Sequence, residues 1–117
     1  MAKIIIFEDD GATCDAITMI LEGAHTVLTI EDFDNWQQDL LQFQPNVAII
    51  DISLGFSDGF KIAEEIKGNA QMKHIGVIIT SASSRLLPAG IEYDAFIEKP
   101  FDIKSLEENV LRLATKN

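Results

Sequence analysis

Short apolar runs alternate with longer amphipathic segments along the whole chain. Each apolar run is bounded by polar residues, which is typical of a buried strand, and the runs predict strands over 3–8, 25–30, 46–51, 75–80 and 94–98. Between them, apolar residues recur at every third or fourth position, which predicts helices over 11–23, 34–44, 58–68 and 102–115. This alternation predicts an α/β fold with a parallel sheet and helices on both of its faces.

The helices are further defined by their caps and their buried stripes. Asp34 is predicted to be the N-cap of the second helix, with Gln37 at the N3 position of a capping box, and Asp102 the N-cap of the last helix. Asp58-Gly59 opens the third helix, and Gly68 marks its end. The predicted inward stripes of the first and last helices contain Ala16, Ile17, Ile20 and Leu21, and Ile103, Leu106, Val110 and Leu113.

The segment between Thr80 and Lys99 is too short for a regular helix. It holds 18 residues, and the fifth strand and two loops of at least ~2 residues each must come out of that number. Pro88 disfavours helical geometry at the residue before it, and Gly90 weakens a helix further. We expect a shortened fourth helix of one or two turns at most, near 84–91, with Leu86, Leu87 and Ile91 covering the sheet irregularly or staying partly exposed for a partner.

The composition limits the class of protein. A chain of 117 residues with 47% hydrophobic content is expected to form one soluble domain over 1–117. No apolar run reaches the ~20 residues of a membrane span, and Cys14 has no second cysteine to pair with, which favours a cytoplasmic location. The net charge of −10 argues against a nucleic-acid surface, because phosphate contacts need clustered lysine and arginine.

Polar side chains stand where four of the predicted strands end. Glu8 and Asp9 follow the first strand, Asp51 ends the third, Thr80 the fourth, and Lys99 follows the fifth. The carboxyl ends of parallel strands line the ligand crevice of such a sheet, so we expect these residues to meet. Crowded carboxylates repel one another unless a cation offsets their charge, and Mg²⁺ prefers oxygen ligands. One carboxylate can then act as a nucleophile toward phosphorus.

Each of these residues also has a simpler interpretation when taken alone. An acidic residue after a strand often complements the next helix dipole, and Asp10 fits that role. Thr80 alone would be a strand-end hydroxyl, and Lys99 alone a solvent-exposed ammonium. The whole set, in order on successive strands, favours a phosphoryl-transfer site.

Five blocks of the sequence resemble the signature blocks of response-regulator receiver domains, the CheY-like family of two-component signalling. The blocks are Phe7-Glu8-Asp9-Asp10, residues 49–54 around Asp51, Asp58-Gly59, Ile79-Thr80-Ser81 and Glu98-Lys99-Pro100-Phe101. The resemblance covers essentially the whole chain. It implies a doubly wound, five-stranded parallel sheet in the flavodoxin-like order 2-1-3-4-5.

The resemblance also implies roles for single residues. Asp51 would accept a phosphoryl group from the phosphohistidine of a sensor histidine kinase or phosphotransfer protein. Asp9 would bind Mg²⁺ directly, Glu8 mainly through water, and the Ser53 backbone carbonyl would be a further ligand. The remaining implied roles are a hydrogen bond from Thr80 to the phosphoryl group, an ion pair from Lys99 to it, a cis Lys99-Pro100 peptide, and a switch role for Phe96, which is otherwise a buried strand aromatic.

Three departures from the family pattern concern the loops. Gly55 stands where proline is frequent, which favours a mobile loop, and Glu92-Tyr93 replaces the usual Gly-Ala. The segment from Thr80 to Lys99 is also shorter than in the family. None of the departures removes a chemical group of the site, but the last two alter the face that receivers use for output.

Three classes of function are compatible with an α/β fold of this kind. The favoured one is a phosphoacceptor signalling domain with a downstream protein target, not an enzyme beyond assisting its own phosphorylation and dephosphorylation. The alternative is a receiver-fold interaction module that does not use phosphorylation; the complete set at the strand ends counts against it. A third class is a flavin- or nucleotide-binding domain, which requires a loop that binds phosphate after the first strand. The acidic residues at 8–10 would repel a phosphate there, which argues against this class.

Overall fold

The computed structural model describes residues 2–30, 33–52, 59–82, 85, 87 and 89–115. Its strands are β1 (Lys3–Phe7), β2 (Thr26–Thr29), β3 (Val47–Asp51), β4 (Gly76–Ser81) and β5 (Ala95–Glu98). Its helices are α1 (Gly11–Leu21), α2 (Trp36–Phe43), α3 (Gly59–Gly68) and α4 (Ile103–Thr115). These elements begin and end within two residues of the predicted bounds. No helix among the described residues is long and apolar enough to cross a membrane.

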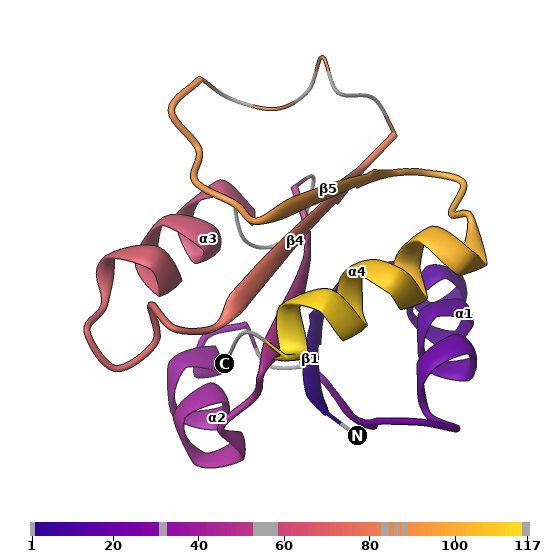
Figure 1. Ribbon diagram of the computed structural model, residues 1–117. Helices are drawn as coiled ribbons and strands as arrows, with labels where there is room; N and C mark the ends of the chain where they lie inside the picture. The colour runs from indigo at the N-terminus through magenta and orange to yellow at the C-terminus, as the bar shows by residue number, and fades with distance from the viewer. Residues whose placement is uncertain are drawn as a thin grey trace.

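The five strands form one parallel sheet in the order β2-β1-β3-β4-β5, which confirms the predicted topology. The helices α1 and α4 cover one face of this sheet, and α2 and α3 cover the other (Figure 1). The chain leaves β1 for β2 on one side and then crosses to β3 on the other side of β1. The carboxyl ends of β1 and β3 therefore adjoin at the point where the strand order reverses, which is where open α/β sheets bind ligands.

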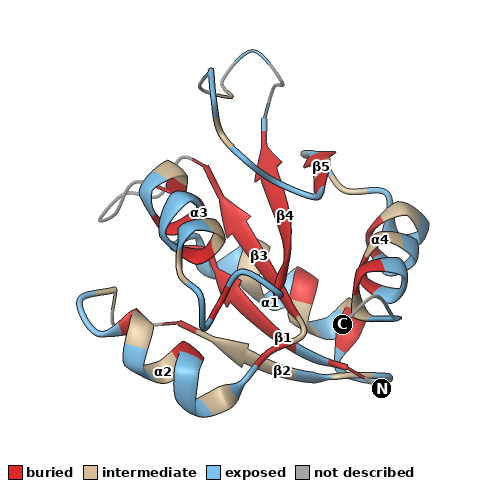
Figure 2. Ribbon diagram, turned by 60° about the vertical axis from the view of Figure 1, so that its left-hand side comes forward, coloured by how far each residue is buried: buried red, intermediate tan, exposed pale blue. Residues whose placement is uncertain are grey.

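The core lies on both faces of the sheet, as a parallel sheet requires. In β1, Ile4 and Ile6 face the α1/α4 layer, whereas Ile5 and Phe7 face the α2/α3 layer. Trp36 of α2 packs edge-on against Phe7, with 5.4 Å between the ring centroids. Figure 2 shows that the buried residues are concentrated in the central strands and on the inner sides of the helices. This packing fixes β1 and β3, whose carboxyl ends carry the predicted acidic residues.

Two residues that were predicted in buried stripes lie at the surface. Ala16 of α1 is exposed, and Ile103 of α4 is 57% exposed. Together with Ile20 and Pro100 they line an open groove of about 440 Å³ between α1 and the start of α4. The stripe correctly predicts which side of each helix faces the sheet. Residues at the margin of a stripe are buried only where a neighbouring element packs against them. Ala16 and Ile103 border the groove instead, so they stay exposed.

The helix caps agree with the prediction in one case and differ in another. Asp102 caps α4, since its Oδ1 accepts a hydrogen bond from the Lys104 backbone N–H at 3.3 Å. The prediction for Asp34 was wrong: α2 begins at Trp36, so its N-cap is Asn35, which makes no side-chain capping hydrogen bond. The start of α2 is instead fixed by the burial of Trp36. The predicted cap of α3 at Asp58 lies outside the described residues.

The connection from β4 to β5 contains no α-helix in the part that the structure describes, which is 82, 85, 87 and 89–94. This agrees with the expected shortening; Leu86 and Pro88 lie outside the described residues. Leu87 and Ile91 are half-buried and pack against the cluster under α2 and α3. A polar contact fixes the end of the connection: the Asp94 carboxylate accepts a hydrogen bond from the Val77 backbone N–H at 2.7 Å.

Candidate functional site

Three carboxylates meet at the reversal point of the sheet. Glu8 and Asp9 directly follow β1, and Asp51 is the last residue of β3. Each offers an oxygen atom, and these oxygens all lie within 4.8 Å of one another. The side chains of Glu8 and Asp51 are buried, whereas Asp9 is exposed. Because β1 and β3 are neighbours in the sheet, Asp9 and Asp51 lie close together although they are 42 positions apart in the sequence.

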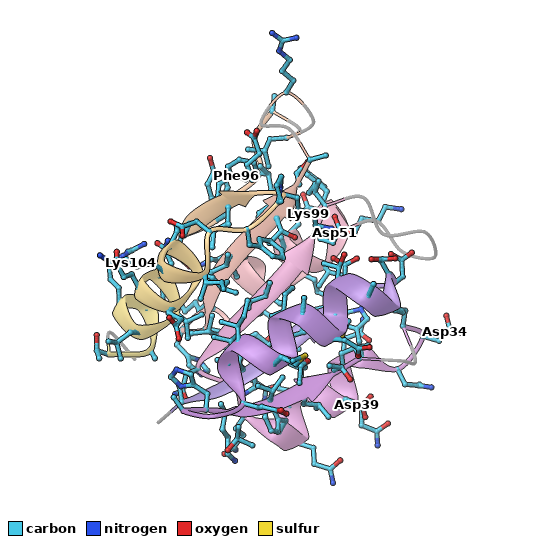
Figure 3. All side chains as sticks on the ribbon, turned by 90° about the vertical axis from the view of Figure 1, so that its right-hand side faces the viewer. Asp34, Asp39, Asp51, Phe96, Lys99 and Lys104 are labelled. Carbon is cyan, nitrogen blue, oxygen red and sulfur yellow. The ribbon has the colours of Figure 1, made fainter. Side chains whose placement is uncertain are left out.

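Lys99 enters the same site from the end of β5. Its Nζ lies 2.8 Å from Glu8 Oε1 and 3.2 Å from Asp51 Oδ2 (Figure 3). Burial opposes a charged lysine, but the hydrogen bond to Glu8 and the charge of Asp51 outweigh it and raise the pKa of Lys99. The ammonium therefore stays charged and offsets part of the repulsion between the two carboxylates.

Both carboxylate oxygens of Glu8 already have protein partners. Oε1 accepts from Lys99, and Oε2 accepts from the Asp10 backbone N–H at 3.2 Å. Burial raises the pKa of Glu8, the hydrogen bond from Lys99 works against that rise, and the neighbouring Asp51 adds to it. Asp10 serves the helix instead: its Oδ2 accepts from the Thr13 backbone N–H at 2.9 Å, so it caps α1 as expected.

The hydroxyl of Thr80 lies buried at the end of β4. Thr80 pairs in register with Asp51 across the sheet and is 1% exposed. Its Oγ1 has no hydrogen-bond partner among the residues that the structure describes. A buried hydroxyl without a partner costs about 1–3 kcal/mol. The site therefore holds an unused donor beside Asp51.

The other predicted site residues are placed as follows. Phe96 is a half-buried residue of β5 that packs against the cluster under α2 and α3, in register with Ile79 of β4. The Lys99-Pro100 peptide is cis, which confirms that prediction. Ser53 lies outside the described residues, so its carbonyl has no described position.

The structure shows two further features that sequence reasoning missed. One is the groove lined by Ala16 and Ile103, which borders Lys99 on the α1 side. The other is the tight packing of Gly59, the first residue of α3, against the main chain of Asp51. Both arise from contacts between elements that are distant in the sequence, for which a local pattern gives no signal.

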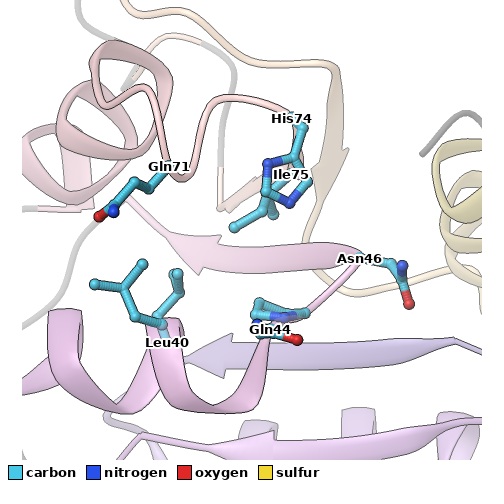
Figure 4. Close-up of a pocket in the computed structure, with 8 residues that line it drawn as sticks. Leu40, Gln44, Asn46, Gln71, His74 and Ile75 are labelled. Atoms are coloured by element: carbon cyan, nitrogen blue, oxygen red, sulfur yellow. The ribbon is translucent and has the colours of Figure 1, made fainter.

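A pocket of about 620 Å³ lies at the opposite edge of the sheet, where the strands begin. It is lined by Leu40 and Gln44 near the end of α2, by Asn46 before β3, and by His74 and Ile75 before β4 (Figure 4). It shares no residue with the acidic cluster. His74 is exposed where it lines this pocket.

Comparison with known proteins agrees with the geometry of the site. The profile of the response regulator receiver domain matches residues 4–111. The chain belongs to the response regulator receiver domain family. This receiver domain is 26% identical, over 97% of its length, to the DNA-binding dual master transcriptional regulator RpaA of Synechocystis, of which the alignment covers 49%. The chain spans about half the length of the curated relatives it matches.

Solved structures show the same fold. The N-terminal domain of the nisin resistance regulator NsrR superposes with a TM-score of 0.84 and 26% identity, covering 97% of this receiver domain and 98% of that chain. The receiver domain of the sensor histidine kinase PA1611 from Pseudomonas aeruginosa has a TM-score of 0.86 and 18% identity, covering 97% and 98%. That structure contains a magnesium ion coordinated in its active site cleft.

Proposed function

We propose that Asp51 is the phosphoacceptor of this receiver domain. The observation that carries the proposal is the buried cluster in which Lys99 lies between Glu8 and Asp51, 2.8 and 3.2 Å from their oxygens. A carboxylate oxygen can act as a nucleophile toward phosphorus, and a lysine ammonium beside it can neutralise charge on the phosphoryl group. Asp51 is also the acidic residue that adjoins both Lys99 and the unused hydroxyl of Thr80 in register.

The donor set fits Mg²⁺. Glu8, Asp9 and Asp51 offer oxygens within 4.8 Å of one another, and Mg²⁺ is commonly held by one or two carboxylates with water in the remaining positions. Because both oxygens of Glu8 are engaged by Lys99 and Asp10, we assign direct ligation to Asp9 and Asp51 and a water-mediated role to Glu8. The Ser53 carbonyl remains a proposed further ligand. When bound, Mg²⁺ neutralises charge on the phosphoryl oxygens and on the carboxylates around them.

The reaction transfers a phosphoryl group from nitrogen to oxygen. A carboxylate oxygen of Asp51 forms a bond to phosphorus as the bond between phosphorus and the donor imidazole nitrogen breaks. The electron pair of the broken bond stays on that nitrogen, and the product is an aspartyl phosphate. Lys99 then pairs with a phosphoryl oxygen, and the Thr80 hydroxyl donates to another, which gives its buried proton a partner.

We infer that the phosphoryl donor is a sensor histidine kinase or a phosphotransfer protein. We propose that this donor docks in the groove between α1 and the start of α4. A protein donor has to touch the surface around Lys99 to bring its phosphorus to Asp51. The groove lined by Ala16, Ile20 and Ile103 offers apolar surface there. A downstream protein target would read the phosphorylated state, with Phe96 as the proposed switch residue.

Substituting the exposed Ala16 tests this docking surface. We expect Ala16→Glu to slow phosphorylation by a protein donor about tenfold, which corresponds to ~1.4 kcal/mol of lost interface energy. Phosphorylation by acetyl phosphate should stay unchanged, because that donor needs no docking surface. Any kinase that phosphorylates the native chain can serve as the protein donor. Equal rates for the native chain and Ala16→Glu with that kinase would mean that the donor binds elsewhere.

Intact mass after incubation with acetyl phosphate and Mg²⁺ tests the acceptor. We expect the native chain to gain one phosphoryl mass and Asp51→Asn to gain none while remaining folded. Undiminished phosphorylation of Asp51→Asn would refute the assignment. A native chain that is folded, binds Mg²⁺ and gains no mass would favour an interaction module that does not use phosphorylation.

A further inference from the structure

Two of the described glycines lie where a side chain does not fit. A Cβ at Gly76 would lie 2.8 Å from Leu113 Cβ, whereas a Cβ at Gly59 would lie 2.3 Å from the carbonyl oxygen of Asp51. Gly76 opens β4 at the edge of the sheet where the strands begin, and Gly59 opens α3 beside the end of β3. The two contacts differ in place, because one meets Leu113 of α4 and the other meets the main chain of the proposed acceptor.

The three atoms nearest to a Cβ at Gly59 would all belong to the main chain. This Cβ would also lie 2.9 Å from Ile52 Cα and 3.1 Å from the carbonyl carbon of Asp51. A clash with main-chain atoms cannot be relieved by a rotamer change, so an element has to move. Gly59 does not have the positive φ that favours glycine elsewhere, so the close approach itself is what requires glycine here.

The end of β3 is held on its other side by β4. Asp51 pairs in register with Thr80, and the Ile52 backbone N–H donates to the Thr80 carbonyl at 3.0 Å. An added carbon at Gly59 would therefore press on a strand end that is already hydrogen-bonded. An ordinary contact of 3.4 Å in place of 2.3 Å requires a relative shift of 1.1 Å.

A shift of that size is large compared with the geometry of the site. The Asp51 carboxylate lies 3.2 Å from Lys99 Nζ, which is already at the long end of an ionic hydrogen bond. Misplacing a reacting group by about 1 Å can cost on the order of 100-fold in rate.

We propose that Gly59 is a positioning residue for Asp51. The close approach of α3 to the Asp51 carbonyl sets the position from which the carboxylate attacks phosphorus. This inference rests on the proposed function of Asp51 as the acceptor.

The test compares Gly59→Ala with Gly76→Ala. Both variants introduce a Cβ into a contact shorter than 3 Å, so both are expected to lose stability. Gly76→Ala presses on Leu113 Cβ, and so on α4, at the edge of the sheet where the strands begin, and no atom of Asp51 is among the three nearest to the added carbon. We measure the free energy of unfolding in urea, and the initial rate of phosphorylation by acetyl phosphate at saturating Mg²⁺.

We expect Gly59→Ala to be phosphorylated about 10- to 100-fold more slowly than the native chain. Gly76→Ala should keep a rate within about twofold of native, whatever stability it loses. A Gly59→Ala rate within twofold of native would overturn the proposal. So would equal slowing of both variants, because a general loss of stability would then explain both.

A variant that does not fold also gives an answer. If Gly59→Ala is unfolded in buffer, its rate is measured in trimethylamine N-oxide, which favours the folded state. A chain that stays unfolded there assigns Gly59 to folding and overturns the positioning role. The native chain and Asp51→Asn, run in the same assay, report separately on the acceptor, so failure of the proposed function is distinguishable from failure of this inference.

Discussion

The amino edge of the sheet, where the strands begin, and the carboxyl edge, where they end, differ in how their polar groups are satisfied. At the amino edge, side chains bond to the main chain of neighbouring strands. Asn46 Oδ1 accepts from the Lys3 backbone N–H at 2.8 Å, and the Asp94 carboxylate accepts from the Val77 backbone N–H at 2.7 Å. These contacts fix the starts of β1, β4 and β5.

At the carboxyl edge like charges are crowded together, and one buried hydroxyl has no partner among the described residues. Glu8, Asp9 and Asp51 bring three carboxylates within 4.8 Å, and Lys99 supplies a single positive charge to two of them. The buried hydroxyl of Thr80 has no partner in the described part of the chain. Crowded like charges and a buried orphan donor both reduce stability.

The difference indicates which edge carries the function. The crowded carboxylates and the Thr80 hydroxyl lie at the same edge, within one cluster. Unfavourable interactions that persist in a folded protein concentrate at functional sites. A cation and a phosphoryl group would satisfy the carboxyl edge, whereas a change at the amino edge should only weaken the fold.

The largest expected effect on stability is at the amino edge. Asp94→Ala removes the acceptor for the Val77 N–H and the ion-pair partner of Lys67. We expect the free energy of unfolding to fall by about 1–3 kcal/mol, measured in urea, with phosphorylation by acetyl phosphate unchanged. Asp94→Asn keeps an oxygen acceptor and should lose less. A variant of normal stability that is phosphorylated slowly would contradict this separation of the two edges.

A smaller effect of opposite sign is expected at the carboxyl edge. Thr80→Val replaces the orphan hydroxyl by a methyl group of similar shape, so the free energy of unfolding of the metal-free protein should rise by about 1 kcal/mol. Thr80→Ser retains a hydroxyl and should show no such gain. A loss of stability in Thr80→Val would mean that the hydroxyl already has a stabilising partner in solution.

The sequence predicts the strands and their polar ends well, because both depend on local pattern. Apolar runs such as Ile4–Phe7 are buried whichever strand they pair with, and the residue after each run necessarily lies at the carboxyl edge. The order of the strands came from the family resemblance, since periodicity does not specify neighbours. The register that pairs Asp51 with Thr80 is seen only in the structure.

What the sequence did not reveal depends on contacts between distant elements. Ala16 and Ile103 are exposed along the groove between α1 and the start of α4, which neither helix encodes by itself. The start of α2 at Trp36 rather than after Asp34 follows from packing on Phe7. The close approach of Gly59 to Asp51 is visible only once α3 is placed against β3.

The response of folding stability to Mg²⁺ tests the account of the carboxyl edge most directly. The native chain should gain about 2.7 kcal/mol in free energy of unfolding when Mg²⁺ is a hundredfold above its Kd. Asp9→Asn removes one of the three crowded charges, so it should be more stable than the native chain without metal and gain little from Mg²⁺. A native chain whose unfolding is indifferent to millimolar Mg²⁺, or an Asp9→Asn variant that is less stable without metal, would contradict the account.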